Sequence, residues 1–123
     1  MKEIVTNKAP AALGPYSQAV VVGDMIYTSG QIPVNPQNGK IPDGAVEQAN
    51  QVFTNIKNLL ESAGSSIDNV VKTTVFIKNM DDFAKINEVY QKYFTKPYPA
   101  RSCVEVARLP KDVLIEVEVI AQI

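Results

Sequence analysis

The C-terminal part of the sequence contains residue types that could bind a small anion and move protons. Arg101 carries a planar guanidinium group, whose fork of N–H donors matches a carboxylate. Glu116 has a carboxylate that could orient a water molecule and move protons, and Glu118 is its rival on the same face of the chain. The simpler interpretation of Arg101 is a strand arginine paired with Glu105 or a neighbouring glutamate, and residue type alone favours that structural role.

Further candidates are polar groups placed where a cleft could form. Cys103 lacks the neighbouring histidine that would activate its thiol, but its backbone N–H could assist anion binding. The others are Tyr16 after a Gly-Pro turn, Ser29 and Gly30 at the end of a predicted strand, and Asn87 beside the apolar stripe of a predicted helix. Each of these also has a purely structural interpretation, as a turn residue, a strand end or a partnered amide.

The composition excludes several kinds of active site. The chain has no histidine and one cysteine, which rules out Ser-His-Asp and Cys-His pairs and argues against zinc. Neither GxxxxGK[ST] nor GxGxxG occurs, so no phosphate-binding loop is predicted. The net charge is −1, without a basic run, and this argues against a dedicated nucleic-acid binder. The sequence therefore predicts no metal and no cofactor.

Length and hydropathy favour one domain that spans residues 1–123. The single cysteine cannot form an internal disulfide, and the first residues lack the apolar core of a signal peptide. No segment approaches the ~18 apolar residues of a membrane span. We therefore expect a cytoplasmic protein that does not enter membranes.

The hydrophobic pattern predicts six strands and two helices. Helix one is expected from Asp43 as N-cap to Gly64, and helix two from Asp81 or Asp82 until the prolines at 97 and 99. Apolar residues recur at steps of three and four in both helices, which indicates one buried stripe on each. The strands are expected at 2–6, 18–22, 25–29, 70–78, 101–107 and 113–121.

This order of elements favours an α+β domain with both helices on one face of a mixed sheet. Strand alternation predicts that Ser102, Val104 and Val106 face the helices. Arg101, Cys103 and Glu105 are then expected on the open face, together with Glu116 and Glu118. A face that mixes charged and apolar residues is a candidate subunit interface with a pocket in it.

Three segments resemble the signature stretches of one family. Residues 14–19 read GPYSQA, residues 28–33 read TSGQIP, and residues 99–112 read PARSCVEVARLPKD. The segment at 71–76, VKTTVF, is also similar. By these motifs the chain is identified as a member of the reactive intermediate deaminase A family, also called the YjgF/YER057c/UK114 family, along essentially its whole length. The connection from Phe94 to Arg101, which carries Tyr98, is shorter than in some members.

The resemblance implies a chorismate-mutase-like fold and a homotrimer with clefts between subunits. It implies deamination of 2-iminobutanoate and 2-iminopropanoate to 2-oxo acids and ammonia without a cofactor. By analogy, Arg101 binds the substrate carboxylate, the Cys103 backbone N–H supports it, and Glu116 positions the attacking water. The same analogy has Tyr16, Ser29, Gly30 and Asn87 line the cleft.

Two other functions stay open. One is an endoribonuclease or translation inhibitor, an activity reported for some relatives. The second is a non-catalytic trimer that binds small carboxylates or a protein partner and regulates it. The absence of a basic groove in the sequence counts against the first, although Arg101, Arg108 and Lys111 lie near one another along the chain.

Overall fold

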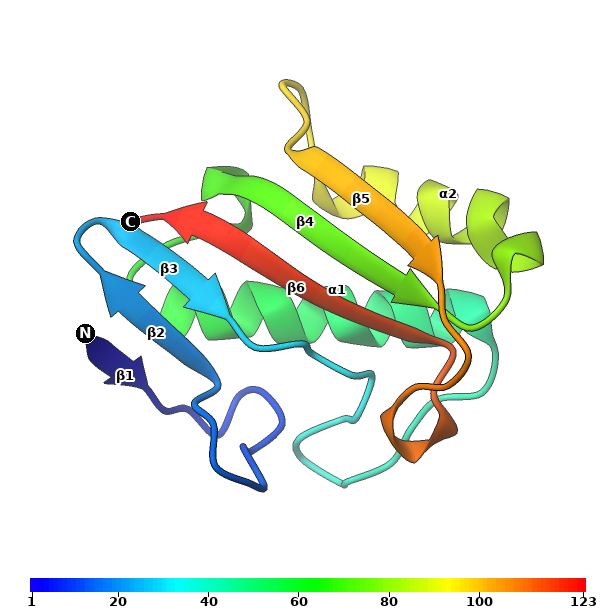
Figure 1. The fold of residues 1–123 in the computed structure, drawn as a ribbon, viewed down its shortest axis with the longest axis horizontal. Helices are drawn as coiled ribbons and strands as arrows, with labels where there is room; N and C mark the ends of the chain where they lie inside the picture. The colour runs from blue at the N-terminus through cyan, green and yellow to red at the C-terminus, as the bar shows by residue number, and fades with distance from the viewer.

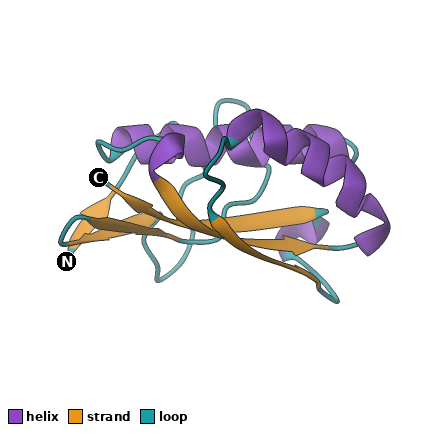
Figure 2. Ribbon diagram, turned by 90° about the horizontal axis from the view of Figure 1, so that it is seen from above, coloured by secondary structure: helices purple, strands orange, loops and turns teal.

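Two layers make up the protein: a six-stranded sheet and a pair of helices that cover one of its faces (Figures 1 and 2). The computed structural model describes residues 1–123. The helices are α1 (Ala45–Ser62) and α2 (Phe83–Tyr93). The strands are β1 (Lys2–Ile4), β2 (Ala19–Val22), β3 (Met25–Thr28), β4 (Val70–Ile77), β5 (Ala100–Glu105) and β6 (Ile115–Gln122). This architecture confirms the predicted α+β class.

The strand order is β1-β2-β3-β6-β4-β5, so the last strand of the chain lies in the middle of the sheet. All neighbours are antiparallel except β4 and β5, which are parallel and are joined through α2. A parallel pair needs such a crossover, and the helix in it covers one face. β5 is consequently an edge strand, with α2 beside it (Figure 1).

Helix α1 forms because its apolar residues share one face, which lies in the core. Ala49, Phe53, Ile56 and Leu60 are each 0% exposed, as the stripe predicted. Its end was predicted correctly, because Gly64 has a φ of 82° and its N–H bonds to the Glu61 carbonyl. Its start was not: Gly44 is the N-cap, and the Asp43 side chain does not cap the helix.

Helix α2 begins where it was predicted to, with Asp82 at its N-cap position, although the Asp82 side chain makes no capping hydrogen bond. A short 3-10 turn (Met80–Asp82) precedes the helix, and Asn79 is the cap of that turn. Its side chain accepts a hydrogen bond from the Asp81 N–H, which it can reach because Asn79 lies just before the turn in extended backbone.

The two faces of β6 are as predicted. Ile115, Val117 and Val119 are buried under the helices, whereas Glu116 and Glu118 lie half-buried on the open face. The strand ends differ from the predicted ones by one or two residues, as at β1, β5 and β6. Such differences arise where pairing with the neighbouring strand stops before the hydrophobic pattern does.

The predicted orientation of β5 was wrong. Thr73, Val75 and Ile77 of β4 are buried under the helices, and they pair with Arg101, Cys103 and Glu105. Paired residues of neighbouring strands project to the same side of a sheet, so these three side chains face the helix layer. Ser102 and Val104 lie on the open face instead. The prediction failed because β5 is an edge strand with mostly exposed residues, whose sequence does not distinguish its faces.

Neither helix is both long and apolar enough to cross a lipid bilayer.

Candidate active site

Arg101 lies on the helix side of the edge strand, where one face of α2 surrounds its guanidinium group. Its Nη1 donates a 2.7 Å hydrogen bond to Asn87 Oδ1. Its Cζ lies 4.7 Å from the centre of the Tyr90 ring and 5.5 Å from that of Phe83. Residues 83, 87 and 90 are spaced by four and three, so they share one helix face. Phe83 and Tyr90 both belong to the apolar stripe predicted for this helix, and the sequence indicated only a core role for them.

The charge of Arg101 has no acidic partner in the protein. The one ion pair of the structure joins Arg108 to Asp112, at 2.9 Å. Glu105, the partner of the simpler interpretation, instead accepts a hydrogen bond from the Met80 N–H. Arg101 is thus an exposed cation held by a neutral amide and two rings, with most of its N–H donors free to bind an anion.

Cys103 lies two residues after Arg101 on the same face of β5, and its side chain is half-buried. Burial raises the pKa of its thiol, and the nearby Arg101 only partly offsets this. The thiol is therefore neutral at physiological pH and a poor nucleophile. The Val106 N–H donates to the Ile77 carbonyl, so by strand alternation the Cys103 N–H points away from β4, toward the open edge of the sheet.

Glu116 lies on the other face of the sheet, directly against the backbone of Gly30. A Cβ at position 30 would overlap Glu116 Oε1, so only glycine allows this approach. Burial raises the pKa of the Glu116 carboxyl, and the neighbouring carboxylate of Glu118 raises it further. The approach to Gly30 distinguishes Glu116 from its rival Glu118, which pairs with Thr74 farther along the strand.

Ser29 and Tyr16 flank Gly30 through hydrogen bonds of the N-terminal loop. Ser29 Oγ donates to the Ser17 carbonyl at 2.6 Å, and its N–H donates to the Gln18 carbonyl. The Tyr16 side chain is 53% exposed, and its hydroxyl oxygen accepts a long 3.4 Å bond from the Leu13 N–H. Tyr16 is therefore held loosely, and its ring is accessible to a ligand.

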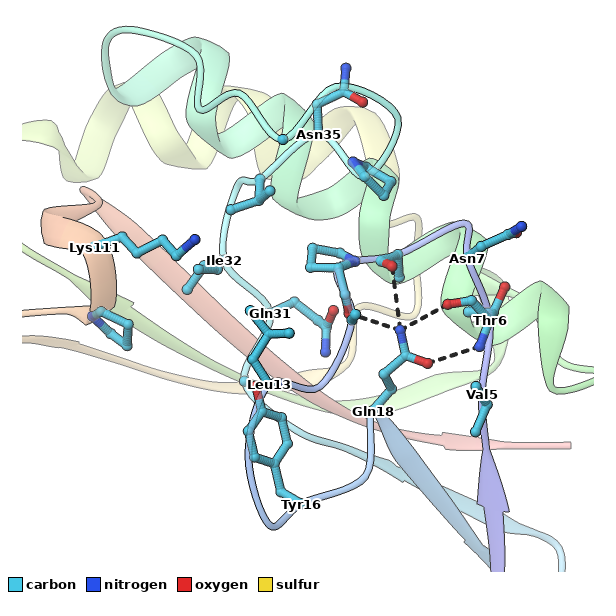
Figure 3. A pocket seen from close by; sticks show the side chains of 18 residues that line it. Val5, Thr6, Asn7, Leu13, Tyr16, Gln18, Gln31, Ile32, Asn35 and Lys111 are labelled. Atoms are coloured by element: carbon cyan, nitrogen blue, oxygen red, sulfur yellow. Dashed lines mark hydrogen bonds between the residues drawn. The ribbon is translucent and has the colours of Figure 1, made fainter.

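Gln18 organises this loop, a role that sequence reasoning did not assign. Its Nε2 donates to the carbonyls of Thr6, Ala9 and Pro10, and its Oε1 accepts from the Thr6 N–H (Figure 3). A glutamine inside the GPYSQA motif was the available signal. Gln18 is only 4% exposed, so it holds the loop together from inside, where it also lines the larger of the two cavities described next.

Two cavities contain four of the predicted site residues, whereas Ser29, Cys103 and Glu116 line neither of them. A cavity of about 510 Å³ is lined by Tyr16 and Gly30, with Thr6 and Asn7 on one side of it and Lys111 on the other (Figure 3). A second, of about 430 Å³, is lined by Asn87, Tyr90, Gln91, Tyr98, Pro99 and Arg101.

Arg101 and Glu116 do not meet within one chain. They project from opposite faces of the sheet, and β4 separates their strands. Neighbouring strands lie about 4.8 Å apart, so a four-carbon substrate cannot touch both side chains across the sheet. No group of three or more cysteine, aspartate or glutamate side chains is placed to hold a metal ion.

Comparison with known proteins identifies close relatives. Residues 6–123 match the model of the family described as Endoribonuclease L-PSP. A protein of Escherichia coli K12 named 2-iminobutanoate/2-iminopropanoate deaminase is 55% identical over 98% of this chain and 96% of its own length. The crystal structure of E. coli TdcF with bound serine matches with a TM-score of 0.95, 51% identity and coverage of 100% and 99%. RidA from Psychrobacter matches with a TM-score of 0.97, 47% identity and full coverage of both chains.

Proposed function

Because the chain belongs to the Endoribonuclease L-PSP family, the family of YjgF and RidA, we propose that it is a 2-iminobutanoate/2-iminopropanoate deaminase. In this proposal the enzyme adds water to small 2-imino acids and releases ammonia and 2-oxo acids, without a cofactor. The identity of 55% to a protein of that name, over nearly the whole of both chains, supports the reaction class.

The observation that carries the proposal is the unpaired guanidinium of Arg101. A substrate carboxylate would supply the missing negative charge and accept two parallel hydrogen bonds. In this proposal the Cys103 N–H, which points toward the same free edge, adds a third donor. A relative's crystal structure with bound serine, a small amino acid with a carboxylate, agrees with a site for such acids.

The proposed reaction needs few catalytic groups. The enamine tautomerises to the imine, water adds at C2, and the carbinolamine expels ammonia to leave a 2-oxo acid. Holding the carboxylate and the water in place supplies most of the acceleration, and one group must move protons. Glu116 takes the second role in this proposal, because its raised pKa keeps it closer to neutral pH than an ordinary glutamate.

Because Glu116 lies on the opposite face of the sheet from Arg101, this proposal requires an assembly of more than one chain. Arg101, Asn87 and Cys103 form one half of the site, and Glu116 and Gly30 form the other on the opposite face. A second copy of the chain must therefore present its Glu116 half to the Arg101 half of the first. Repeated head to tail, such contacts close into a ring, and a homotrimer with three clefts between subunits fits this requirement.

The test is a coupled assay in which threonine dehydratase generates the imine and semicarbazide traps what survives. The wild type is expected to suppress semicarbazone formation, whereas Arg101→Ala should raise KM by about 10- to 100-fold, since charge-assisted hydrogen bonds are lost. Arg108→Ala is the matched control, because Arg108 is exposed and paired with Asp112. Equal activity of the wild type and folded Arg101→Ala would refute the role of Arg101.

The family model's description keeps an endoribonuclease as the second candidate. The structure argues against RNA binding by the cluster of Arg101, Arg108 and Lys111, because Arg108 forms an ion pair with Asp112. RNA cleavage that copurifies with the protein and disappears in Arg101→Ala would favour it. A wild type that binds 2-oxobutanoate but does not accelerate imine loss would favour a non-catalytic carboxylate-binding trimer.

A further inference from the structure

Tyr90 connects the guanidinium of Arg101 to the core of the protein. Its ring lies 4.7 Å from Arg101 Cζ, and it shares the cavity wall with Arg101 and Asn87. Its hydroxyl oxygen lies 2.8 Å from Oγ1 of Thr73, a residue that is 0% exposed. Thr73 of β4 is paired with Arg101 of β5. Thr73, which holds the Tyr90 ring, and Arg101, which the ring supports, are therefore neighbours in the sheet.

The orientation of the Tyr90 ring is fixed from several directions. Phe53 meets it edge-on, with ring centres 5.6 Å apart and an angle of 85°. Phe94 packs against it at 4.4 Å. With its hydroxyl bonded to Thr73 as well, the ring cannot turn without breaking a buried contact.

The ring also stays uncharged. Burial raises the pKa of the Tyr90 phenol, and the hydrogen bond shared with Thr73 and the charge of Arg101 offset this only in part. A neutral ring attracts the guanidinium through its π face without cancelling its positive charge. A carboxylate in the same place would hold Arg101 as firmly, but it would compete with the substrate.

Asn87 alone cannot set the direction of the guanidinium. It holds one nitrogen, about which the group could still swing, whereas a ring beside the guanidinium restricts that motion. We propose that Tyr90 is a positioning residue for substrate binding: its ring, tethered to Thr73, aims the free N–H groups of Arg101 into the cleft. This inference rests on the proposed function, in which Arg101 binds the substrate carboxylate.

The test compares three substitutions in the coupled imine assay. Tyr90→Leu removes the ring and is expected to raise KM by about 2- to 30-fold, the range of a cation–π contact, with a smaller change in kcat. Tyr90→Phe keeps the ring and should restore most of the wild-type KM. Tyr93→Leu is the matched control: Tyr93 lies on the same helix, and it packs against Phe53 at 5.4 Å and bonds to Thr54 instead of approaching Arg101.

Other outcomes would overturn the inference. If Tyr90→Leu has the KM of the wild type, or if Tyr93→Leu raises KM equally, Tyr90 is only a core residue. If Tyr90→Leu does not fold, Tyr90→Met replaces it, because a flexible apolar side chain fills more of the core space of the ring but lacks its π face. An unchanged KM in that variant would equally refute positioning by the Tyr90 ring. A wild type without activity would instead refute the proposed function itself.

Discussion

Arg101 and Glu116 differ in what the protein does to their charges. The guanidinium of Arg101 is exposed and is held by groups that leave its charge uncompensated. The Glu116 carboxyl is half-buried beside a second carboxylate, which disfavours its ionised form. The first arrangement suits a permanent anion site. The second suits a group that must gain and lose a proton.

The pH dependence of activity tests the environment of Glu116. If the ionised form is required, kcat/KM should fall as the pH drops through the raised pKa of Glu116. Glu118→Gln removes the like charge, so the inflection should move to lower pH. The measurement is a pH profile of kcat/KM for the wild type and this variant.

Glu105→Gln provides the control for that profile. Glu105 is an exposed glutamate on the helix side of the sheet, away from Glu116. Its substitution should leave the inflection where it is. An inflection that stays in place in Glu118→Gln as well would contradict the electrostatic account.

Residue types with a chemical role could be predicted from sequence, but their surroundings could not. Arg101 and Glu116 were singled out by their chemistry, Gly30 by its place at a predicted strand end and Asn87 by its place beside a helix stripe, and the family resemblance then gave each a role. The contacts of Tyr90 and Phe83 with Arg101 were missed, because an aromatic residue on a helix stripe is most simply a core residue. Only the fold shows that the stripe extends past the core to the edge strand.

Among the elements, β5 shows most clearly where sequence patterns fail. The central strand β6 alternates between buried and half-buried residues, and its faces were predicted correctly. In β5 almost every residue is exposed, so buried and exposed residues do not alternate, because the strand lies at the sheet edge. Its orientation follows from its parallel register with β4, a long-range property that local periodicity does not contain.

The N-terminal loop depends on one buried side chain. Gln18→Leu would leave the carbonyls of Thr6, Ala9 and Pro10 and one N–H without their partner. Leaving buried polar groups unsatisfied costs about 1–3 kcal/mol each, less where water can enter. We expect the free energy of unfolding to fall by about 2–3 kcal/mol, measured by urea denaturation.

Gln37→Leu is the matched control for this substitution, since Gln37 is exposed and its side chain forms no hydrogen bond. It should change stability by less than about 0.5 kcal/mol. Equal effects of the two substitutions would mean that the Gln18 bonds do not stabilise the loop.

At the scale of the whole molecule, the two halves of the proposed site face away from each other. The open face also presents apolar side chains, with Tyr27 42% and Val104 44% exposed. Both features have the same explanation if this face meets a second copy. A single chain contains each half but not the cleft. The mixed pattern of the open face predicted a subunit interface, and only the family resemblance predicted that it forms a trimer.

A charge on the open face tests this assembly. Val104→Glu should weaken the trimer, because an unpaired carboxylate would be buried between subunits. Val46→Glu is the control, since Val46 is similarly exposed, at 38%, but lies on helix α1 in the other layer. Analytical ultracentrifugation should show dissociation of the first variant only. A trimer that withstands Val104→Glu would place the interface elsewhere.

The most direct test of a site shared between subunits is complementation between two impaired variants, assayed at substrate concentrations far below the KM of Arg101→Ala, where each has little activity. Arg101→Ala and Glu116→Gln are co-expressed with different tags, and the mixed oligomers are purified through both tags and assayed for imine hydrolysis. In a closed ring of three, every mixed trimer contains one cleft with both residues intact, so about one-third of wild-type activity should return. If each cleft instead takes both residues from one chain, the mixed oligomers will stay as inactive as their parents, and the composite site will be wrong.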